Sequence, residues 1–97
     1  MAGREGMPKR LKAVFAGTVQ GVGFRAGAEN LARQYPVTGY VRNLASGKVE
    51  VVSEGEEEAL RNFISALRDS HLAAYIRNVA TEWSEASGEF SGFKITR

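Results

Sequence analysis

Apolar positions along the chain follow two alternating spacings, which predict strands and helices in turn. From Leu11 to Thr18 the residues are mostly apolar, as in a buried strand. Apolar residues then recur at the spacing of one helix face from Phe24 to Tyr35, and Pro36 ends this predicted helix. A second stripe with helical spacing consists of Leu60, Phe63, Ile64 and Leu67.

The remaining segments predict further strands. Val37–Leu44 and Lys48–Ser53 are strand-like, and the Ser-Gly pair between them indicates a hairpin turn. Tyr75–Ser84 alternates as a strand does, and a loop over Gly88–Gly92 leads to a short closing strand over Phe93–Arg97. The order β-α-β-β-α-β-β predicts an α+β fold of the ferredoxin-like type, an α/β sandwich. Two helices would cover one face of a mostly antiparallel sheet of four to five strands.

Composition bounds the domain organisation. A chain of 97 residues has room for one hydrophobic core, so we expect a single domain over residues 9–97 after a flexible lead-in over residues 1–8. The net charge of +2 suits a small anionic ligand better than a nucleic acid or a membrane surface. No apolar run reaches the length of a membrane span. We therefore expect a cytoplasmic monomer that binds neither nucleic acid nor membrane.

The residue inventory also limits the chemistry. The chain has no Cys and one His, His71, which excludes thiolate nucleophiles, Cys-based zinc sites and any site with several His ligands. The acidic run Glu54–Glu58 is interpreted as the solvated start of the second helix, and not as a metal site. We therefore expect no metal and no cofactor.

The most informative segment is the glycine-rich stretch from Gly17 to Arg25, between the first strand and the first helix. Gly21 and Gly23 allow the backbone to fold into a concave nest, and the N–H groups at a helix start lack intrahelical partners. Such a site binds anions, and the guanidinium of Arg25 has a shape that matches phosphate oxygens. The alternative is that the glycines only form a tight turn and that Arg25 is a solvated surface residue.

Two established phosphate motifs do not fit this segment. The P-loop pattern is absent. Residues 21–26 do match the glycine spacing of a dinucleotide-binding fold, but that fold needs an acidic residue at the end of a parallel second strand. Here the second strand ends in Arg42-Asn43-Leu44 and turns into a hairpin. We reject both.

The residues themselves resemble the acylphosphatase family. The resemblance covers residues 9–97 and rests on Gly17-x-Val-Gln-Gly-Val-Gly-Phe-Arg25, Gly39-Tyr-Val-Arg-Asn-Leu44, Gly47-x-Val-Glu-Val and the closing Gly92-Phe-x-Ile95. It implies a ferredoxin-like fold and metal-independent hydrolysis of the carboxyl-phosphate bond of small acyl phosphates. The implied partners are that substrate and inorganic phosphate, as product or inhibitor.

The resemblance also implies a role for each site residue. Arg25 would bind the phosphate, and Asn43 would orient the attacking water. The backbone amides of Gln20, Gly21, Val22, Gly23 and Phe24 would hold the phosphoryl oxygens. The sequence departs from the family at Ala26 and Gly27, where larger residues are common, and at Tyr40, where Trp is common.

Other residues have simpler interpretations. Arg42 alternates with Asn43 along its strand, so we expect it on the opposite face of the sheet and solvated. Tyr40 and Trp83 are expected to pack, and His71 to lie on the surface.

Two other functions remain as alternatives. One is a phosphate or carbamoyl-phosphate sensor, or a detached relative of the acylphosphatase-like domain of larger maturation enzymes. The other is an RNA-binding module, which the lack of aromatics over Lys48–Ser53 disfavours.

Overall fold

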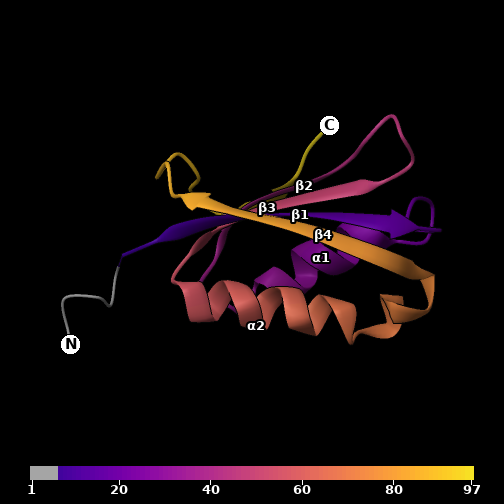
Figure 1. Cartoon of the computed structure of the whole chain (residues 1–97), viewed down its shortest axis with the longest axis horizontal. Coiled ribbons are helices and arrows are strands. Elements are labelled where there is room, and N and C mark those ends of the chain that lie inside the picture. The colour runs from indigo at the N-terminus through magenta and orange to yellow at the C-terminus, as the bar shows by residue number, and fades with distance from the viewer. Residues whose placement is uncertain (1–6) are drawn as a thin grey trace.

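The computed structural model describes residues 7–97, so the lead-in predicted over residues 1–8 lies largely outside the described part. The elements follow the predicted order (Figure 1). They are β1 (Lys9–Gly17), α1 (Phe24–Ala32), β2 (Thr38–Asn43), β3 (Val49–Gly55), α2 (Glu57–Arg68), a short 3-10 helix (His71–Tyr75), β4 (Ile76–Glu85) and β5 (Phe93–Ile95).

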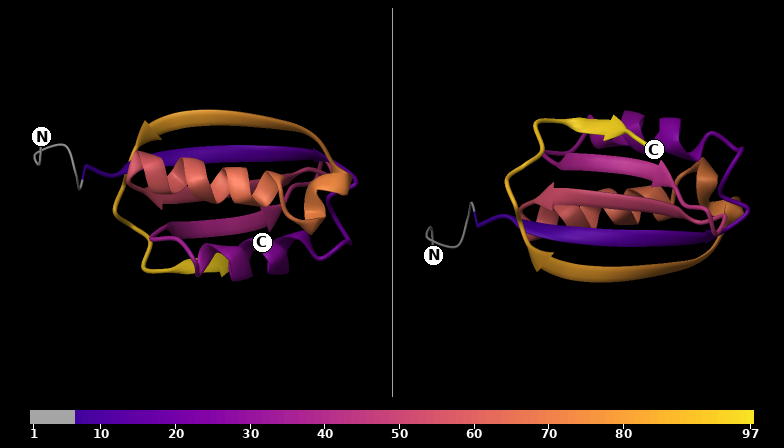
Figure 2. Two further views of the ribbon diagram at one scale, coloured as in Figure 1. Left: turned by 90° about the horizontal axis from the view of Figure 1, so that it is seen from below. Right: turned by 90° about the horizontal axis from the view of Figure 1, so that it is seen from above.

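The strands form one sheet in the order β4-β1-β3-β2-β5. Neighbouring strands run antiparallel except β2 and β5, which are parallel. Both helices lie on one side of the sheet, and the opposite face is left open (Figures 1 and 2). The predicted ferredoxin-like fold is therefore confirmed, and the closing strand lies beside the second strand.

The core lies between the helices and the sheet. Alternate residues of each central strand face the helices, as the buried positions Leu11, Ala13 and Phe15 of β1 show. The stripe predicted on α2 is buried in full: Leu60, Phe63, Ile64 and Leu67. At the sheet edge, the Phe93 ring of β5 packs on Phe63 with ring centroids 5.4 Å apart. The core thus reaches from α2 to the last strand.

Some element boundaries differ from the sequence-based ones. α1 ends at Ala32, short of the predicted Tyr35, and residues 33–36 form turns before Val37. The predicted strand from Tyr75 begins at Ile76, because Tyr75 closes the 3-10 helix. The carbonyl of Tyr75 accepts a hydrogen bond from Thr18 N–H at 2.9 Å, which joins this helix to the loop after β1.

Glu54 corrects one prediction. It belongs to β3, where it is 5% exposed, and not to a solvated helix start. Its carboxylate accepts hydrogen bonds from Arg10 Nε at 2.8 Å, from the backbone N–H groups of Ser87 (2.8 Å) and Gly88 (3.0 Å), and from Ser87 Oγ at 3.0 Å. The sequence interpretation failed because Glu54 stands in a run of acidic residues that is typical of a solvated helix start. The residues that bind its carboxylate, on the open face of the sheet, are distant in sequence.

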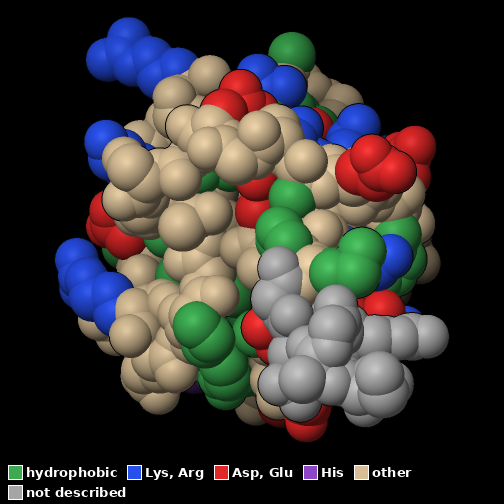
Figure 3. Space-filling view, turned by 90° about the vertical axis from the view of Figure 1, so that its left-hand side faces the viewer, with side chains coloured by type: hydrophobic (Ala, Val, Ile, Leu, Met, Phe, Trp, Pro, Cys, Tyr) green, Lys and Arg blue, Asp and Glu red, His purple; other side chains and the backbone are tan. Residues whose placement is uncertain are grey.

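Arg42 corrects a second prediction. It lies on the open face, as expected, but it is not simply solvated. Its Nε lies 2.6 Å from Glu50 Oε1, and Glu50 is buried beneath it. At the end of the molecule shown in Figure 3, acidic and basic side chains are interspersed.

In the described part of the chain, no helix has the length and apolar character needed to cross a membrane.

Candidate active site

The loop between β1 and α1 has the backbone shape expected of an anion site. Gly21 and Gly23 both have left-handed backbones, with φ of 81° and 82°. Gly23 is also the N-cap of α1. Apart from the glycine and its two chain neighbours, no described atom lies within 4 Å of where a side-chain Cβ would stand at either position. The loop, residues 17–23, therefore presents bare backbone to open space.

The backbone N–H groups of this loop are free to bind a ligand. From Gln20 to Arg25, none donates a hydrogen bond to any residue that the structure describes. The first turn of α1 contains no acidic residue that would compete for an anion. Since the positive end of the helix dipole lies at the same place, the loop and the helix start together have the geometry and the polarity that suit an anion.

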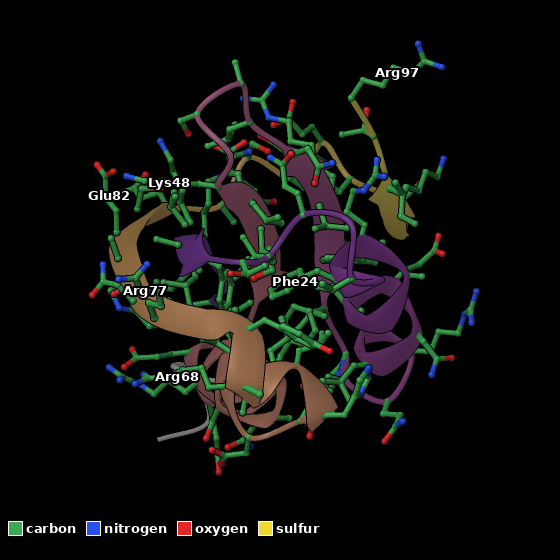
Figure 4. The ribbon with its side chains drawn as sticks, turned by 90° about the vertical axis from the view of Figure 1, so that its right-hand side faces the viewer. Phe24, Lys48, Arg68, Arg77, Glu82 and Arg97 are labelled. Carbon is green, nitrogen blue, oxygen red and sulfur yellow. The ribbon has the colours of Figure 1, made fainter. Side chains whose placement is uncertain are left out.

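Phe24 and Arg25 have different roles at the start of α1: one side chain is buried in the core, and the other is exposed beside the pocket. The Phe24 ring is 2% exposed and packs on Phe15 of β1, with ring centroids 4.9 Å apart. Figure 4 looks at this end of the molecule and shows Phe24 pointing inward. The next side chain, Arg25, is exposed and borders the pocket beside the loop. The buried ring thus fixes the helix start that carries the cation.

Asn43 reaches the same pocket from the last residue of β2. Val41 is buried on the helical side of the sheet, so alternation places Asn43 on that side too. The pocket has a volume of about 230 Å³ and is lined by Val19, Gly21, Gly23, Phe24, Arg25, Ala26, Asn43 and Ile95. Among the described residues, none forms a hydrogen bond with the Asn43 side chain. Its amide is therefore available to a ligand or a water molecule.

Gln20 connects the two halves of the site. Its side-chain Nε2 donates to the carbonyl of Leu44 at 2.8 Å and to the carbonyl of Lys48 at 2.9 Å. Both acceptors lie at the base of the hairpin between β2 and β3, next to Asn43. The sequence suggested a role only for the Gln20 backbone. The side chain in fact ties the loop to the segment that holds Asn43.

The structure brings most of the predicted residues together. Gly21, Gly23, Phe24, Arg25 and Asn43 line one pocket, whereas Gln20 and Val22 belong to the loop without lining it. The sequence did not point to the apolar wall formed by Val19, Ala26 and Ile95. Ile95 comes from the far end of the chain and reaches the site because β5 pairs with β2, opposite Val41. A closing strand of three residues gives no sequence signal for that partner.

The unusual Gly27 has a packing explanation. A Cβ at this position would lie 3.1 Å from Cδ1 of Leu72, which is 1% exposed in the 3-10 helix. Gly27 therefore allows close approach between α1 and this helix. The departure at Gly27 is thus matched by the position of Leu72.

The pocket lining lacks a protein base. None of its residues is Asp, Glu, His, Lys, Tyr or Cys. Among residues 7–97, no group of three or more His, Cys, Asp or Glu side chains is arranged as metal ligands would be. What the described site offers is a ring of amides, one guanidinium and one carboxamide. This set can bind an anion and position a small polar molecule beside it.

Comparison with known proteins identifies the family. The family model described as Acylphosphatase matches residues 11–95, almost the whole chain. The chain belongs to the acylphosphatase family. An acylphosphatase from Salinibacter ruber is 40% identical over 92 residues, which cover 95% of this chain and 97% of that one. An acylphosphatase from Thermus thermophilus is 42% identical over 86 residues, covering 89% and 97%.

Solved structures agree with the assignment to the acylphosphatase family. The crystal structure of acylphosphatase from Bacillus subtilis superposes with a TM-score of 0.84 at 28% identity, covering 92% of this chain and 99% of that one. A full-length HypF structure in a phosphate- and nucleotide-bound form gives the same TM-score at 31% identity, but the match covers 93% of this chain and 12% of that one. The fold thus accounts for nearly all of one of these chains and for a small part of the other.

Proposed function

We propose that this chain hydrolyses the carboxyl-phosphate bond of small acyl phosphates without a metal ion, at the pocket between the glycine-rich loop and Asn43. The family makes it an acylphosphatase, a hydrolase that acts on acid anhydrides. The observation that carries the proposed mechanism is the composition of the pocket: free amides, Arg25 and Asn43, with no protein base among the lining residues. We place the enzyme in the cytoplasm as a monomer.

The phosphoryl group would bind in the loop. The N–H groups of Gln20 to Phe24 point their partial positive charge at its oxygens, and Arg25 adds two parallel donors. Because these groups are fixed by the fold before the substrate arrives, they need no reorganisation as charge redistributes over the phosphoryl oxygens. The apolar wall of Val19, Ala26 and Ile95 lies beside this anion site.

Asn43 would hold the attacking water. In the reaction the water oxygen forms a bond to phosphorus while the bond from phosphorus to the acyl oxygen breaks. The electron pair of that bond leaves with the carboxylate. One proton of the water passes to a phosphoryl oxygen and the other stays on the attacking oxygen, so the products are a carboxylate and inorganic phosphate. This route needs a leaving group that departs without being protonated, and a carboxylate meets that condition.

The test is hydrolysis of benzoyl phosphate, followed by ultraviolet absorbance in the presence of a chelator. We expect Arg25→Ala to lower kcat/KM by about 10²–10³, because one preorganised donor to the transition state is lost. Arg25→Lys should recover little of this, since a point charge cannot replace a planar guanidinium. Arg33→Ala is a matched control, because Arg33 is an exposed Arg at the other end of α1.

The same assay separates the roles of the two residues. Asn43→Ala should lower kcat strongly while inhibition by inorganic phosphate stays near the wild-type value, because water and not phosphate is its proposed partner. Equal loss of turnover and of phosphate inhibition in Asn43→Ala would contradict this role. Loss of wild-type activity on addition of chelator would contradict metal independence.

A phosphate-binding module remains the second candidate, supported by the match to part of HypF. A folded wild-type chain that binds phosphate but does not hydrolyse benzoyl phosphate would favour it. The match covers 97% and 99% of two acylphosphatase chains but only 12% of the HypF chain, and this difference favours the enzyme.

A further inference from the structure

Beside β4, the helical side of the sheet is left uncovered. Val79, Thr81 and Trp83 pair with buried residues of β1, so their side chains point toward the side of the sheet that carries the helices. Viewed from that side, α2 crosses the middle of the sheet and β4 lies beyond it at one margin (Figure 2, left). Thr81 and Trp83 are exposed although their partners on β1 are buried. The side of the sheet that carries the helices is therefore buried along the central strands but open to solvent along β4.

Two adjoining hollows follow the line between α2 and β4. One, of about 190 Å³, lies between Arg61, Arg68 and Trp83, and the other, of about 350 Å³, lies between Arg68, Arg77 and Val79. Arg68 belongs to both linings, and the two hollows together are here called the β4 groove. Its length follows the strand from Arg77 to Trp83. A ligand that filled it would have to be elongated.

The β4 groove is positively charged. Its lining contains Arg61, Arg68 and Arg77 against a single acidic residue, Asp69. Arg61 is paired with Glu57 at 2.7 Å, but neither Arg68 nor Arg77 forms an ion pair with any residue in the described range. Figure 4 shows Arg68 and Arg77 beside β4 on the same side of the molecule. The groove therefore favours a ligand that carries negative charge.

The outer edge of β4 adds a second recognition element. β4 has ten residues and stands at the end of the strand order, so its outer backbone groups face no strand in the described chain. The one register shift against β1 lies at Ala16/Gly17, next to Arg77, and the strand contains no Pro. The opposite edge is formed by a strand of only three residues, β5. A long regular edge of this kind can accept an added strand.

Trp83 offers an apolar contact at one end of the groove. Its ring is 36% exposed, and the Arg61 guanidinium lies over it, 5.0 Å from the centroid. An amphipathic ring beside arginines is the usual composition of an interface anchor. The groove thus combines arginines of α2 and β4 with the ring of Trp83, and it lies beside the unpaired edge of β4.

We propose that the β4 groove binds an extended acidic segment of another protein, which adds a strand to the free edge of β4. Alternate side chains of that segment would face the helical side, and its carboxylates would pair with Arg68 and Arg77. A second copy of this chain is a poorer occupant, because it would bring its own three arginines to the same place. A nucleic acid would match the charge but has no backbone N–H and C=O pattern for a strand edge.

The test uses Trp83 as the reporter, since it is the only Trp in the chain. Trp emission is followed during titration with a synthetic peptide in which threonine alternates with glutamate, at low and moderate salt. We expect saturable binding that weakens as salt rises. Arg68→Glu and Arg77→Glu should each weaken it by about tenfold, whereas Arg33→Glu, the same charge change outside the groove, should leave it unchanged.

Hydrolysis of benzoyl phosphate by each variant serves as the check on folding, because Arg68 and Arg77 lie outside the active-site pocket. Unchanged hydrolysis together with lost peptide binding would support the proposal. Three results would overturn it: no change in emission with the glutamate peptide, equal binding of a peptide with lysine in place of glutamate, or tighter binding of a single-stranded oligonucleotide. Self-association that Arg77→Glu abolishes, seen by sedimentation, would assign the groove to a second copy instead.

Discussion

The side chain of Gln20 joins two parts of the site that are 24 residues apart in sequence. We expect Gln20→Leu, which keeps the size of the side chain, to lower kcat/KM for benzoyl phosphate by about tenfold, because the loop loses its link to the Asn43 strand. The cost in stability should be small. The carbonyls of Leu44 and Lys48 keep other donors, the backbone N–H groups of Gly47 and Leu44.

The measurement pairs steady-state kinetics with urea unfolding. Gln34→Leu is the control, since Gln34 is exposed in the turn after α1. If Gln20→Leu lost stability as a buried hydrogen-bonding residue does and left kcat/KM intact, Gln20 would be a structural residue and not a positioning one.

Gly27 gives a packing prediction. Gly27→Val should lower the free energy of unfolding by about 1–3 kcal/mol, because the new side chain has to enter space held by Leu72. Leu72→Ala alone should cost about 2–5 kcal/mol through the cavity that it leaves. In the double variant the two changes should cost less than their sum, since each relieves the other. Additive costs in urea unfolding would show that the two residues do not share this contact.

Residues near in sequence were the predictable part of the site. The loop glycines, Phe24 and Arg25 lie in one segment, and their spacing indicated a nest at a helix start. Asn43 was identified through its motif and through the alternation that separates it from Arg42. Ile95 and the side-chain role of Gln20 depend on strand pairing and on contacts between loops, and a single sequence does not encode these as a local pattern.

At the scale of elements, Glu54 fastens the connection between β4 and β5 to the open face of the sheet. Burial alone would raise the pKa of this carboxyl. The hydrogen bonds from Ser87 N–H, Arg10 and Gly88 N–H outweigh that effect and hold its pKa at about 2, below the ordinary value of 4.5. The ionised carboxylate is thus strongly favoured in the folded protein.

This shift sets a pH dependence. Above about pH 4.5 the Glu54 carboxylate is ionised in both the folded and the unfolded chain, and its contribution to stability is fully present. As the pH falls from about 4.5 to about 2 the unfolded chain takes up the proton first, so this contribution is lost. We expect Glu54→Gln to lower the free energy of unfolding at pH 7 by about 2–3 kcal/mol.

Urea unfolding of the wild type and of Glu54→Gln from pH 7 to pH 2 measures this. The difference between them should shrink as the pH falls through that window. Glu58→Gln, an exposed carboxylate on α2, is the control and should show little effect. A difference that stays constant with pH would mean that the charge of Glu54 does not contribute.

Element-scale prediction succeeded where apolar spacing was regular. The stripe on α2, the part of the first stripe that ends at Ala32 and the central strands followed the sequence pattern, because each buries one face against a common core. Glu54 and Tyr75 were misplaced for a shared reason. The partners that decide their state, Ser87 and Gly88 for one and Thr18 for the other, lie far along the chain and become neighbours only in the folded sheet.

For the molecule as a whole, phosphate binding should appear as thermal stabilisation. A ligand that binds only the folded state adds about 2.7 kcal/mol when present at a hundred times its Kd. Inorganic phosphate should therefore raise the Tm of the wild type and of Asn43→Ala in the presence of chelator, and raise that of Arg25→Ala much less. Sodium chloride at equal ionic strength tests for a general salt effect. Equal shifts in all variants would remove the loop as the phosphate site.

The strand order has a consequence for how the protein is made. β1 lies between β3 and β4 in the sheet. It therefore receives its second neighbour only when residues 76–85, which are synthesised much later, are available. The pocket also needs Ile95 of β5. While the ribosome still encloses these last strands, the chain already carries Arg25 and Asn43 but has no completed sheet to hold them. A nascent chain stalled at that stage would be exposed to chaperones and proteases, and it would be catalytically silent until β4 and β5 emerged.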